Sequence, residues 1–108
     1  MNDMIAFKAI ELTRCYLLRT LGMNFTRQTP LRIGQWVENR ENGFTAAKRL
    51  SGAREVIKIA NGRKKKERPF RTAIAIIQGE QVMRQNGWSI TFKRIKILDI
   101  IERSKVTR

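Results

Sequence analysis

The chain contains no histidine, a single cysteine and only nine acidic residues among its 108. With Cys15 alone, a disulfide within the chain is impossible, and the ligands of a zinc finger are missing. Histidine is the commonest general base, and the sequence also lacks a phosphate-binding glycine loop and a nucleophile elbow. We therefore expect no catalytic residues, no metal and no cofactor, and we do not expect an enzyme.

Long apolar runs are also missing. No stretch approaches about 18 uncharged apolar residues, so the sequence predicts no membrane span, and its first residues lack the pattern of a signal peptide. We expect a cytoplasmic protein. The apolar share of 42%, with five Phe and two Trp, is sufficient for a hydrophobic core. The length predicts one domain, residues 1–108.

Positive charge is abundant, since 23 Lys and Arg give a formal net charge of +14. Ten of these basic residues lie between Lys48 and Arg71, where only Glu55 and Glu67 oppose them. Arg outnumbers Lys by 14 to 9, and guanidinium groups can form bidentate bonds with phosphates and with guanine edges. The composition predicts a polyanionic partner, and it favours nucleic acid, with DNA ahead of RNA.

The first half of the chain has the apolar spacing of helices. Residues 3–21 mix Leu, Ile and Met with charged residues, contain no Gly or Pro, and are followed by Gly22, so we expect an N-terminal helix. Its apolar stripe is broad, which is typical of core packing or of a homodimer interface. Residues 90–103 are the other segment expected at such an interface. A Thr-Pro step at Pro30 predicts the start of a second helix.

The next segment resembles a helix-turn-helix, with a short helix over residues 46–50, a Ser51–Gly52 turn and a second helix over 53–60. Small residues at the helix contact and in the turn are typical of that motif, as are spaced apolar anchors in its second helix. The basic loop from Arg63 to Arg68 would form its wing. A strand over residues 54–60, of which 55–59 are β-branched and partly alternating, remains the alternative.

The C-terminal third, residues 72–104, predicts a hairpin, a final helix, or both. Asn86–Gly87 is a strong turn signal between residues 81–84 and 88–92, and the apolar residues of the second run alternate as they do in a half-buried strand. Residues 93–104 are apolar on several sides, so they fit either a well-buried element or one that pairs with another copy.

The candidate site follows from these elements. Arg54 and Lys58 would share one face of the second helix and read base edges in a major groove, while the loop after Arg63 would grip phosphates. A weaker C-terminal patch adds to the basic surface. The candidate nucleic-acid-binding residues are Lys48, Arg49, Arg54, Lys58, Arg63, Lys64, Lys65, Lys66, Arg68, Arg71, Lys93, Arg94 and Lys96.

Together these features predict an α+β fold: a small, mostly helical domain with a winged helix-turn-helix-like unit over residues 30–71 and a C-terminal hairpin, helix or both. The expected function is sequence-specific DNA binding by a small, homodimeric transcriptional regulator of bacterial, phage or plasmid type. This step rests on what small basic helix-turn-helix proteins commonly do. The alternatives are an RNA-binding module, or a non-specific DNA-binding accessory of a DNA-processing complex.

Overall fold

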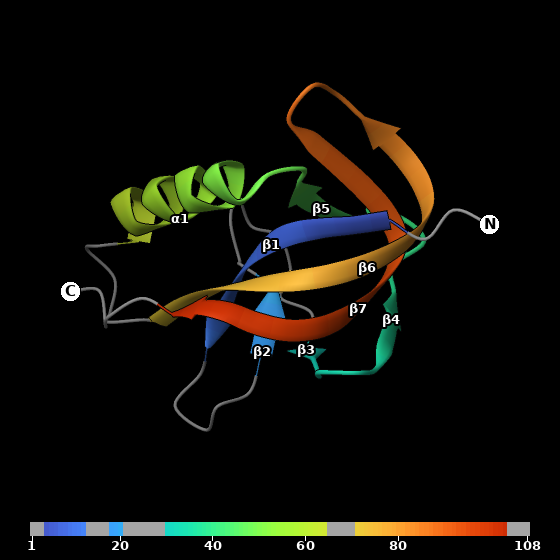
Figure 1. Ribbon diagram of the computed structural model, residues 1–108, viewed down its shortest axis with the longest axis horizontal. Helices are drawn as coiled ribbons and strands as arrows, with labels where there is room; N and C mark the ends of the chain where they lie inside the picture. Colours follow the sequence, from blue (N-terminus) through green and yellow to red (C-terminus); the bar gives the residue numbers. More distant parts are fainter. Residues whose placement is uncertain (1–3, 13–17, 21–29, 65–70, 104–108) are drawn as a thin grey trace.

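The computed structural model describes residues 4–12, 18–20, 30–64 and 71–103, with side chains for all of these except 12, 18–20, 60–64 and 71. This part of the chain forms seven strands and one helix (Figure 1). The elements are β1 (Met4–Leu12), β2 (Leu18–Thr20), β3 (Pro30–Leu31), β4 (Trp36–Glu38), β5 (Phe44–Ala47), α1 (Leu50–Lys64), β6 (Arg71–Gln85) and β7 (Ser89–Arg103).

The four main strands pair in a closed ring. β1 pairs with β6 along its whole length, β6 pairs with β7, β7 pairs with β5, and β5 pairs back with β1 at Phe7 and Ala47. All four pairings are antiparallel. On the edge of β1 that faces β5, residues 10–12 pair with β2, and β2 pairs in turn with β3. On the edge of β7 that faces β5, residues 94–96 pair with β4. A closed arrangement leaves fewer unpaired strand edges than an open sheet does.

The main hydrophobic core fills this ring. On β1, Ala6 and Ile10 point inward and are buried, whereas the alternate residue Phe7 packs on the side of α1. Side chains alternate between the faces of a strand, so β1 is buried on both sides. The buried residues of the main core are Ala6, Ile10, Leu31, Phe44, Ala46, Ala73, Ala75, Ile77, Ile90, Phe92, Ile95 and Ile97.

β6 and β7 both bend sharply near their middles, so the outer half of this hairpin leaves the plane of the inner half (Figure 1). Gln81 in β6 has a φ of 57°, and the register with β7 shifts between Val82 and Arg84. Gly43 lies beside the bent hairpin at a φ of 69°. A β-carbon there would lie 2.6 Å from Sδ of Met83. Only glycine combines this backbone conformation with so close an approach.

α1 covers one outer face of the sheet. Leu50, Ala53 and Ile57 recur at helical spacing and pack against a second core cluster that includes Ala47 and Ile74. The helix approaches β5 closely, because a β-carbon on Gly52 would lie 3.0 Å from the β-carbon of Ala47. Small residues at this contact therefore bring α1 against the sheet. Within the described ranges, no helix is long and apolar enough to cross a membrane.

The expected α+β fold, mostly helical with a winged helix-turn-helix, is wrong, because strands dominate the described residues. The N-terminal helix expected over residues 3–21 is replaced by β1 and β2. From Ala6 onward both faces of β1 are covered, by the main core on one side and α1 on the other, so its sequence is apolar over much of its length. A run of this kind cannot be distinguished from a buried helix by periodicity alone.

The helix-turn-helix-like unit over residues 30–71 is also wrong. Pro30 begins a short strand instead of a helix, a position where a strand tolerates proline. The helix expected over 46–50 does not form: residues 46–47 end β5, residues 48–49 form a bend, and Leu50 begins α1. Ser51–Gly52 lies inside the first turn of α1 instead of forming a turn. The small residues that resembled a helix–helix contact serve the close approach of α1 to β5. The helix over 53–60 is confirmed, and the strand alternative is wrong.

The expected C-terminal hairpin is confirmed, with β6 and β7 on either side of Asn86–Gly87. The alternative of a final helix over 93–104 is wrong, because β7 continues to Arg103. β7 pairs with β6 along one edge, and its residues 94–96 also pair with β4 along the other edge. Ile95 and Ile97 on this segment are buried in the main core, whereas Leu98 and Ile101 stay exposed. Much of the basic loop expected as a wing, residues 65–68, lies outside the described residues.

Candidate nucleic-acid interface

The structure describes the side chains of twelve of the 23 Lys and Arg and of seven of the nine Asp and Glu, a net charge of +5. Of the predicted site, Arg63 and Lys64 end α1 and Arg71 begins β6, but their side chains are not among those described. Lys65, Lys66 and Arg68 lie outside the described residues. The larger part of the basic run therefore stays a prediction.

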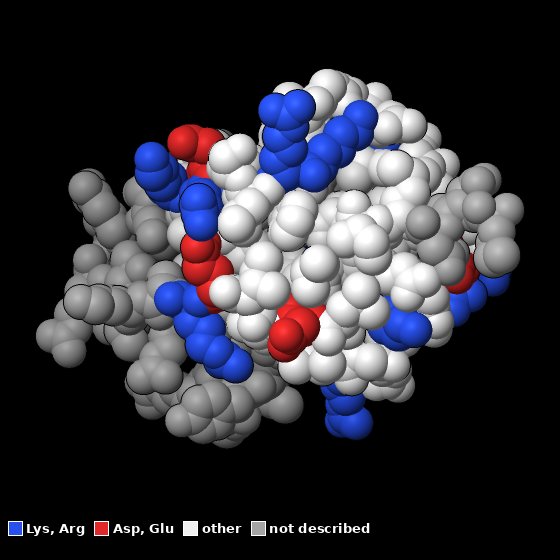
Figure 2. All heavy atoms as spheres, in the orientation of Figure 1, with Lys and Arg blue, Asp and Glu red and all other residues white. Residues whose placement is uncertain are grey.

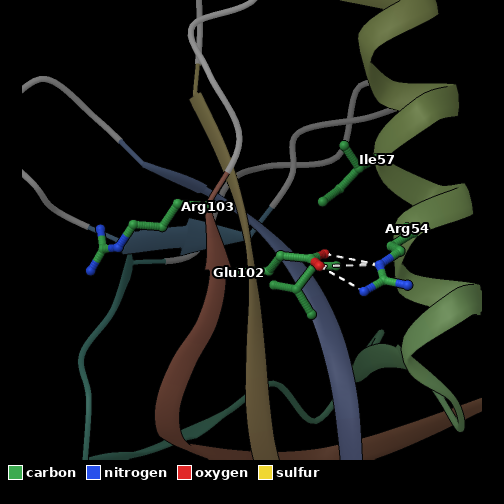
Figure 3. A pocket seen from close by; sticks show the side chains of 5 residues that line it. Arg54, Ile57, Glu102 and Arg103 are labelled. Atoms are coloured by element: carbon green, nitrogen blue, oxygen red, sulfur yellow. Dashed lines mark hydrogen bonds and ion pairs between the residues drawn. The ribbon is translucent and has the colours of Figure 1, made fainter.

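Several predicted cations face acidic partners. Arg54 on α1 forms a bidentate ion pair with Glu102 on β7, at 2.8 Å between Nη2 and Oε1 (Figure 3). Their hydrogen bond raises the pKa of Arg54 and lowers the pKa of Glu102. Lys58 pairs with Glu55 at 3.5 Å on the same helix. The two residues predicted to read bases are therefore engaged within the protein.

The Arg54–Glu102 pair forms one side of a shallow pocket between α1 and β7 (Figure 3). Ile57 and Ile74 supply its apolar lining, and Arg103 completes it. The pair ties the helix to the sheet across this pocket. The pocket holds no described group of three His, Cys, Asp or Glu side chains suited to a metal ion.

A different cationic surface forms where α1 begins. The backbone N–H of Lys48 donates to the carbonyl of Trp88 over 2.9 Å, so the segment before α1 lies beside the turn of the β6–β7 hairpin. The Trp88 side chain is 59% exposed, and Arg49 is also exposed. Among the described residues, neither Lys48 nor Arg49 has an acidic partner. The first turn of α1 contains no acidic residue, so the positive end of the helix dipole adds to these two charges.

Arg84 lies on the same hairpin. It is opposite Thr91 in the register of β6 and β7, and Thr91 is opposite Thr45 of β5, with their hydroxyls hydrogen-bonded at 2.9 Å. Arg84 is exposed and has no acidic partner in the part of the chain that the structure describes. We call Lys48, Arg49, Arg84 and Trp88 the hairpin end. In Figure 2, basic side chains lie at the upper edge of the molecule, over the start of α1 and the hairpin, and others lie along the left and lower edges of this face.

The turn itself fixes the backbone of Trp88. The side-chain oxygen of Asn86 accepts hydrogen bonds from the backbone N–H groups of Trp88 and Ser89, each at 2.9 Å. The N–H of Asn86 in turn donates to the carbonyl of Ser89. Asn and Asp favour turns because their short side chains make such local bonds. The exposed indole is therefore carried by a turn with its own internal hydrogen bonds.

The C-terminal patch predicted from the sequence lies on β7. Lys93, Arg94 and Lys96 are all partly exposed, and the guanidinium carbon of Arg94 lies 4.4 Å from the ring centroid of Trp36 on β4. Nζ of Lys96 lies 5.1 Å from the same centroid. Arg94 is also 3.7 Å from Glu80. The place of Trp36 in this patch depends on the pairing of β4 with β7, which sets Trp36 opposite Lys96.

Lys8 is a buried cation that sequence reasoning missed. It points into the ring of strands, and its ammonium donates to the carbonyl of Thr45 over 2.8 Å. Burial lowers the pKa of Lys8 from 10.5 to about 8. This carbonyl lies just past the single pair that joins β1 to β5, so Lys8 satisfies a backbone acceptor where these strands separate. We assign Lys8 a structural role.

The predicted homodimer remains a prediction. Met4 and Ile5 on β1, with Leu98 and Ile101 on β7, are large apolar side chains that stay exposed. They fall within the two segments, 3–21 and 90–103, expected at an interface.

Comparison with protein-family models, with curated protein sequences and with solved structures found no match to this chain. The function must therefore be argued from the surface itself.

Proposed function

We propose that this protein binds nucleic acid through the hairpin end, without strong sequence preference. The observation that carries the proposal is the backbone hydrogen bond from Lys48 to Trp88, which brings the segment of an exposed indole next to cations that have no acidic partner among the described residues. Stacking of aromatic rings on bases, combined with basic groups that track the phosphates, is the common means of binding unpaired strands. The net charge of +14 supplies the long-range attraction.

Sequence-specific reading of duplex DNA, the expected work of a transcriptional regulator, finds less support. A recognition helix must present a free face to the major groove. Within the described residues the one helix packs its apolar side on the sheet, and Arg54 and Lys58 on its surface are paired with Glu102 and Glu55. The net positive charge still supports the two alternatives, an RNA-binding module and a non-specific DNA-binding accessory, and we favour them over the regulator.

The test measures binding of labelled single-stranded DNA, single-stranded RNA and duplex DNA by fluorescence anisotropy across a salt series. The double variant Lys48→Ala with Arg49→Ala should weaken binding and reduce the log–log salt slope by about 1.4 for single strands, which is the value for two lost phosphate contacts. Trp88→Ala should weaken single-strand binding while leaving the salt slope unchanged, because stacking releases no counterions.

The matched control removes the same charge elsewhere. Arg40 and Lys58 are exposed but paired with Glu38 and Glu55, so replacing both with Ala should leave the slope near that of the native chain. Equal losses from the two double variants would show that total charge, and not the hairpin end, determines binding. If no nucleic acid binds at low salt, the proposal fails.

A further inference from the structure

The side chains around Trp36 form a second aromatic and cationic surface on β7. Arg94 and Lys96 both contact the indole, at 4.4 Å and 5.1 Å from its centroid. Both cations come from β7, and β4 lies at the end of the described sheet, with no strand paired along its far side. Lys96 has no acidic partner among the described residues. The indole is therefore held in place from one side and stays partly exposed.

A purely structural role accounts for only part of this arrangement. A cation–π contact at a partly exposed site contributes about 0.5–1 kcal/mol, and one such contact would suffice to hold β4 against β7. Here two cations share one ring, although each could instead be solvated. Crowded like charges are unfavourable unless an anion balances them, and Glu80 lies 3.7 Å from Arg94 alone. An added phosphate near Lys96 would balance the second charge.

β7 connects this surface to the hairpin end. The first part of β7 leads from Ser89, next to Trp88, to Lys96, opposite Trp36. At about 3.3 Å per residue the path is at most about 23 Å, and the bend of β7 shortens it. Lys93 lies on the way and is partly exposed, without an acidic partner in the described part of the chain. Domains that bind unpaired strands cover about 4–16 nucleotides, so one strand has ample length for this path.

The bend decides between a single strand and a duplex. Duplex DNA is stiff over about 150 base pairs, and bending it over a few base pairs is costly. A single strand can follow a curved surface. We propose that Trp36 and Lys96 form a second stacking point, so that one single strand of DNA or RNA binds the hairpin end and Trp36 at the same time along β7. This inference rests on the proposed function at the hairpin end and names the substrate class of that site.

The experiment compares oligothymidylates and oligouridylates of about 4 to about 16 nucleotides. For the native chain, affinity should rise steeply once a strand is long enough to reach both indoles. Trp36→Leu should leave the shortest strands unaffected and weaken the longest about tenfold or more, within the range expected for loss of one stacked base. Lys96→Gln should lower the salt slope for long strands only. Arg40→Gln, which removes a paired surface cation close to β4, is the matched control.

The outcomes separate the two proposals. If the native chain binds no oligonucleotide, both fail. If Trp88→Ala weakens binding but Trp36→Leu and Lys96→Gln match the native chain at every length, the hairpin end stands and the second stacking point is wrong. Urea unfolding of each variant checks the fold. Should Trp36→Leu unfold, Trp36→Phe retains a ring and must keep the steep length dependence, and Lys96→Gln still decides the question. DNA and RNA series run in parallel show which sugar is preferred.

Discussion

The aromatic ring of Phe92 lies against the backbone of Gly79, in the space that a β-carbon at residue 79 would occupy. Gly79 is buried in β6, and Phe92 is fully buried in the main core. The contact lies near the bend of the hairpin, where the inner and outer halves of β6 and β7 separate. The absence of a side chain at residue 79 therefore allows the Phe92 ring to fill the corner.

Gly79→Ala should lower the free energy of unfolding by about 1–3 kcal/mol, the usual cost of overpacking a core, because the Phe92 ring must move. Urea unfolding measures the change. Gly87→Ala is the control: nothing lies within 4 Å of a β-carbon built there, and its backbone is not in the left-handed region. A similar loss at both positions would mean that residue 79 has no special packing role.

Gln81 has a left-handed backbone conformation, with a φ of 57°. A side chain branched at the β-carbon is strongly disfavoured there, whereas glycine adopts it freely. Gln81→Val should therefore destabilise the protein by about 1–2 kcal/mol, while Gln81→Gly should not. Thermal unfolding followed by circular dichroism compares the two variants. Equal melting temperatures for both would show that the bend relaxes to accommodate residue 81.

Lys8 should make stability depend on pH. Its pKa in the folded protein is about 8, below the usual 10.5. Below pH 8 both states carry the proton, and the folded state bears the cost of a buried charge. Between pH 8 and 10.5 the folded protein loses the proton while the unfolded chain keeps it, so the free energy of unfolding should rise through this window, by up to about 3 kcal/mol.

Lys8→Met provides the comparison. Without a buried charge, the variant should be more stable than the native chain at pH 7, even after loss of the hydrogen bond to Thr45, which contributes about 1 kcal/mol. Urea unfolding at a series of pH values should show the difference shrinking above pH 8. Other groups titrate equally in both proteins. A constant difference at every pH would contradict the assignment of a charged, buried Lys8 at neutral pH.

Some parts of the fold could be read from the sequence, and the reasons differ by element. The hairpin at Asn86–Gly87 could be predicted because its signal is local: the side chain of Asn86 bonds to the next two backbone N–H groups. β1 could not, because burial of both its faces depends on α1 and β6, which are distant in sequence. The small residues near Gly52 correctly predict that another element lies close to this segment, but they do not show that this element is β5.

The site was predictable only in part. Composition alone predicts a polyanionic partner, and the sequence analysis includes Lys48, Arg49 and Lys96 among the candidate binding residues. Which cations are free depends on pairings across the fold, such as Arg54 with Glu102, which are 48 positions apart. Trp88 is exposed at a turn whose neighbours come from the segment before α1. Neither relationship leaves a pattern in local spacing.

Arg54→Ala tests the consequence of that pairing. If Arg54 read bases, its loss would change the preference among sequences. Because its guanidinium is bound by Glu102, we expect affinity and salt slope for single strands to stay unchanged, with a small loss of thermal stability as α1 loses its tie to β7. Anisotropy titrations beside Arg49→Ala, which removes a cation that has no acidic partner in the described part of the chain, check this. An equal effect of both changes would place Arg54 in the interface.

Substitutions of Asn86 can separate the effect of the turn structure on binding from the effect of surface charge. Asn86→Ala removes both hydrogen bonds that fix the backbone of Trp88, so the indole must be ordered on binding. We expect weaker single-strand binding, though less so than for Trp88→Ala, and a modest loss of stability from the missing turn bonds.

Asn86→Asp should behave differently. A carboxylate can accept the same two N–H groups, so the turn and the free energy of unfolding should be retained. The new negative charge lies in the turn whose Trp88 accepts the backbone hydrogen bond of Lys48, so it should weaken binding most at low salt and flatten the salt slope. Anisotropy at two salt concentrations and urea unfolding measure the two effects separately. If Asp at residue 86 leaves binding unchanged at low salt, the phosphates lie elsewhere on the molecule and the hairpin end is not the interface.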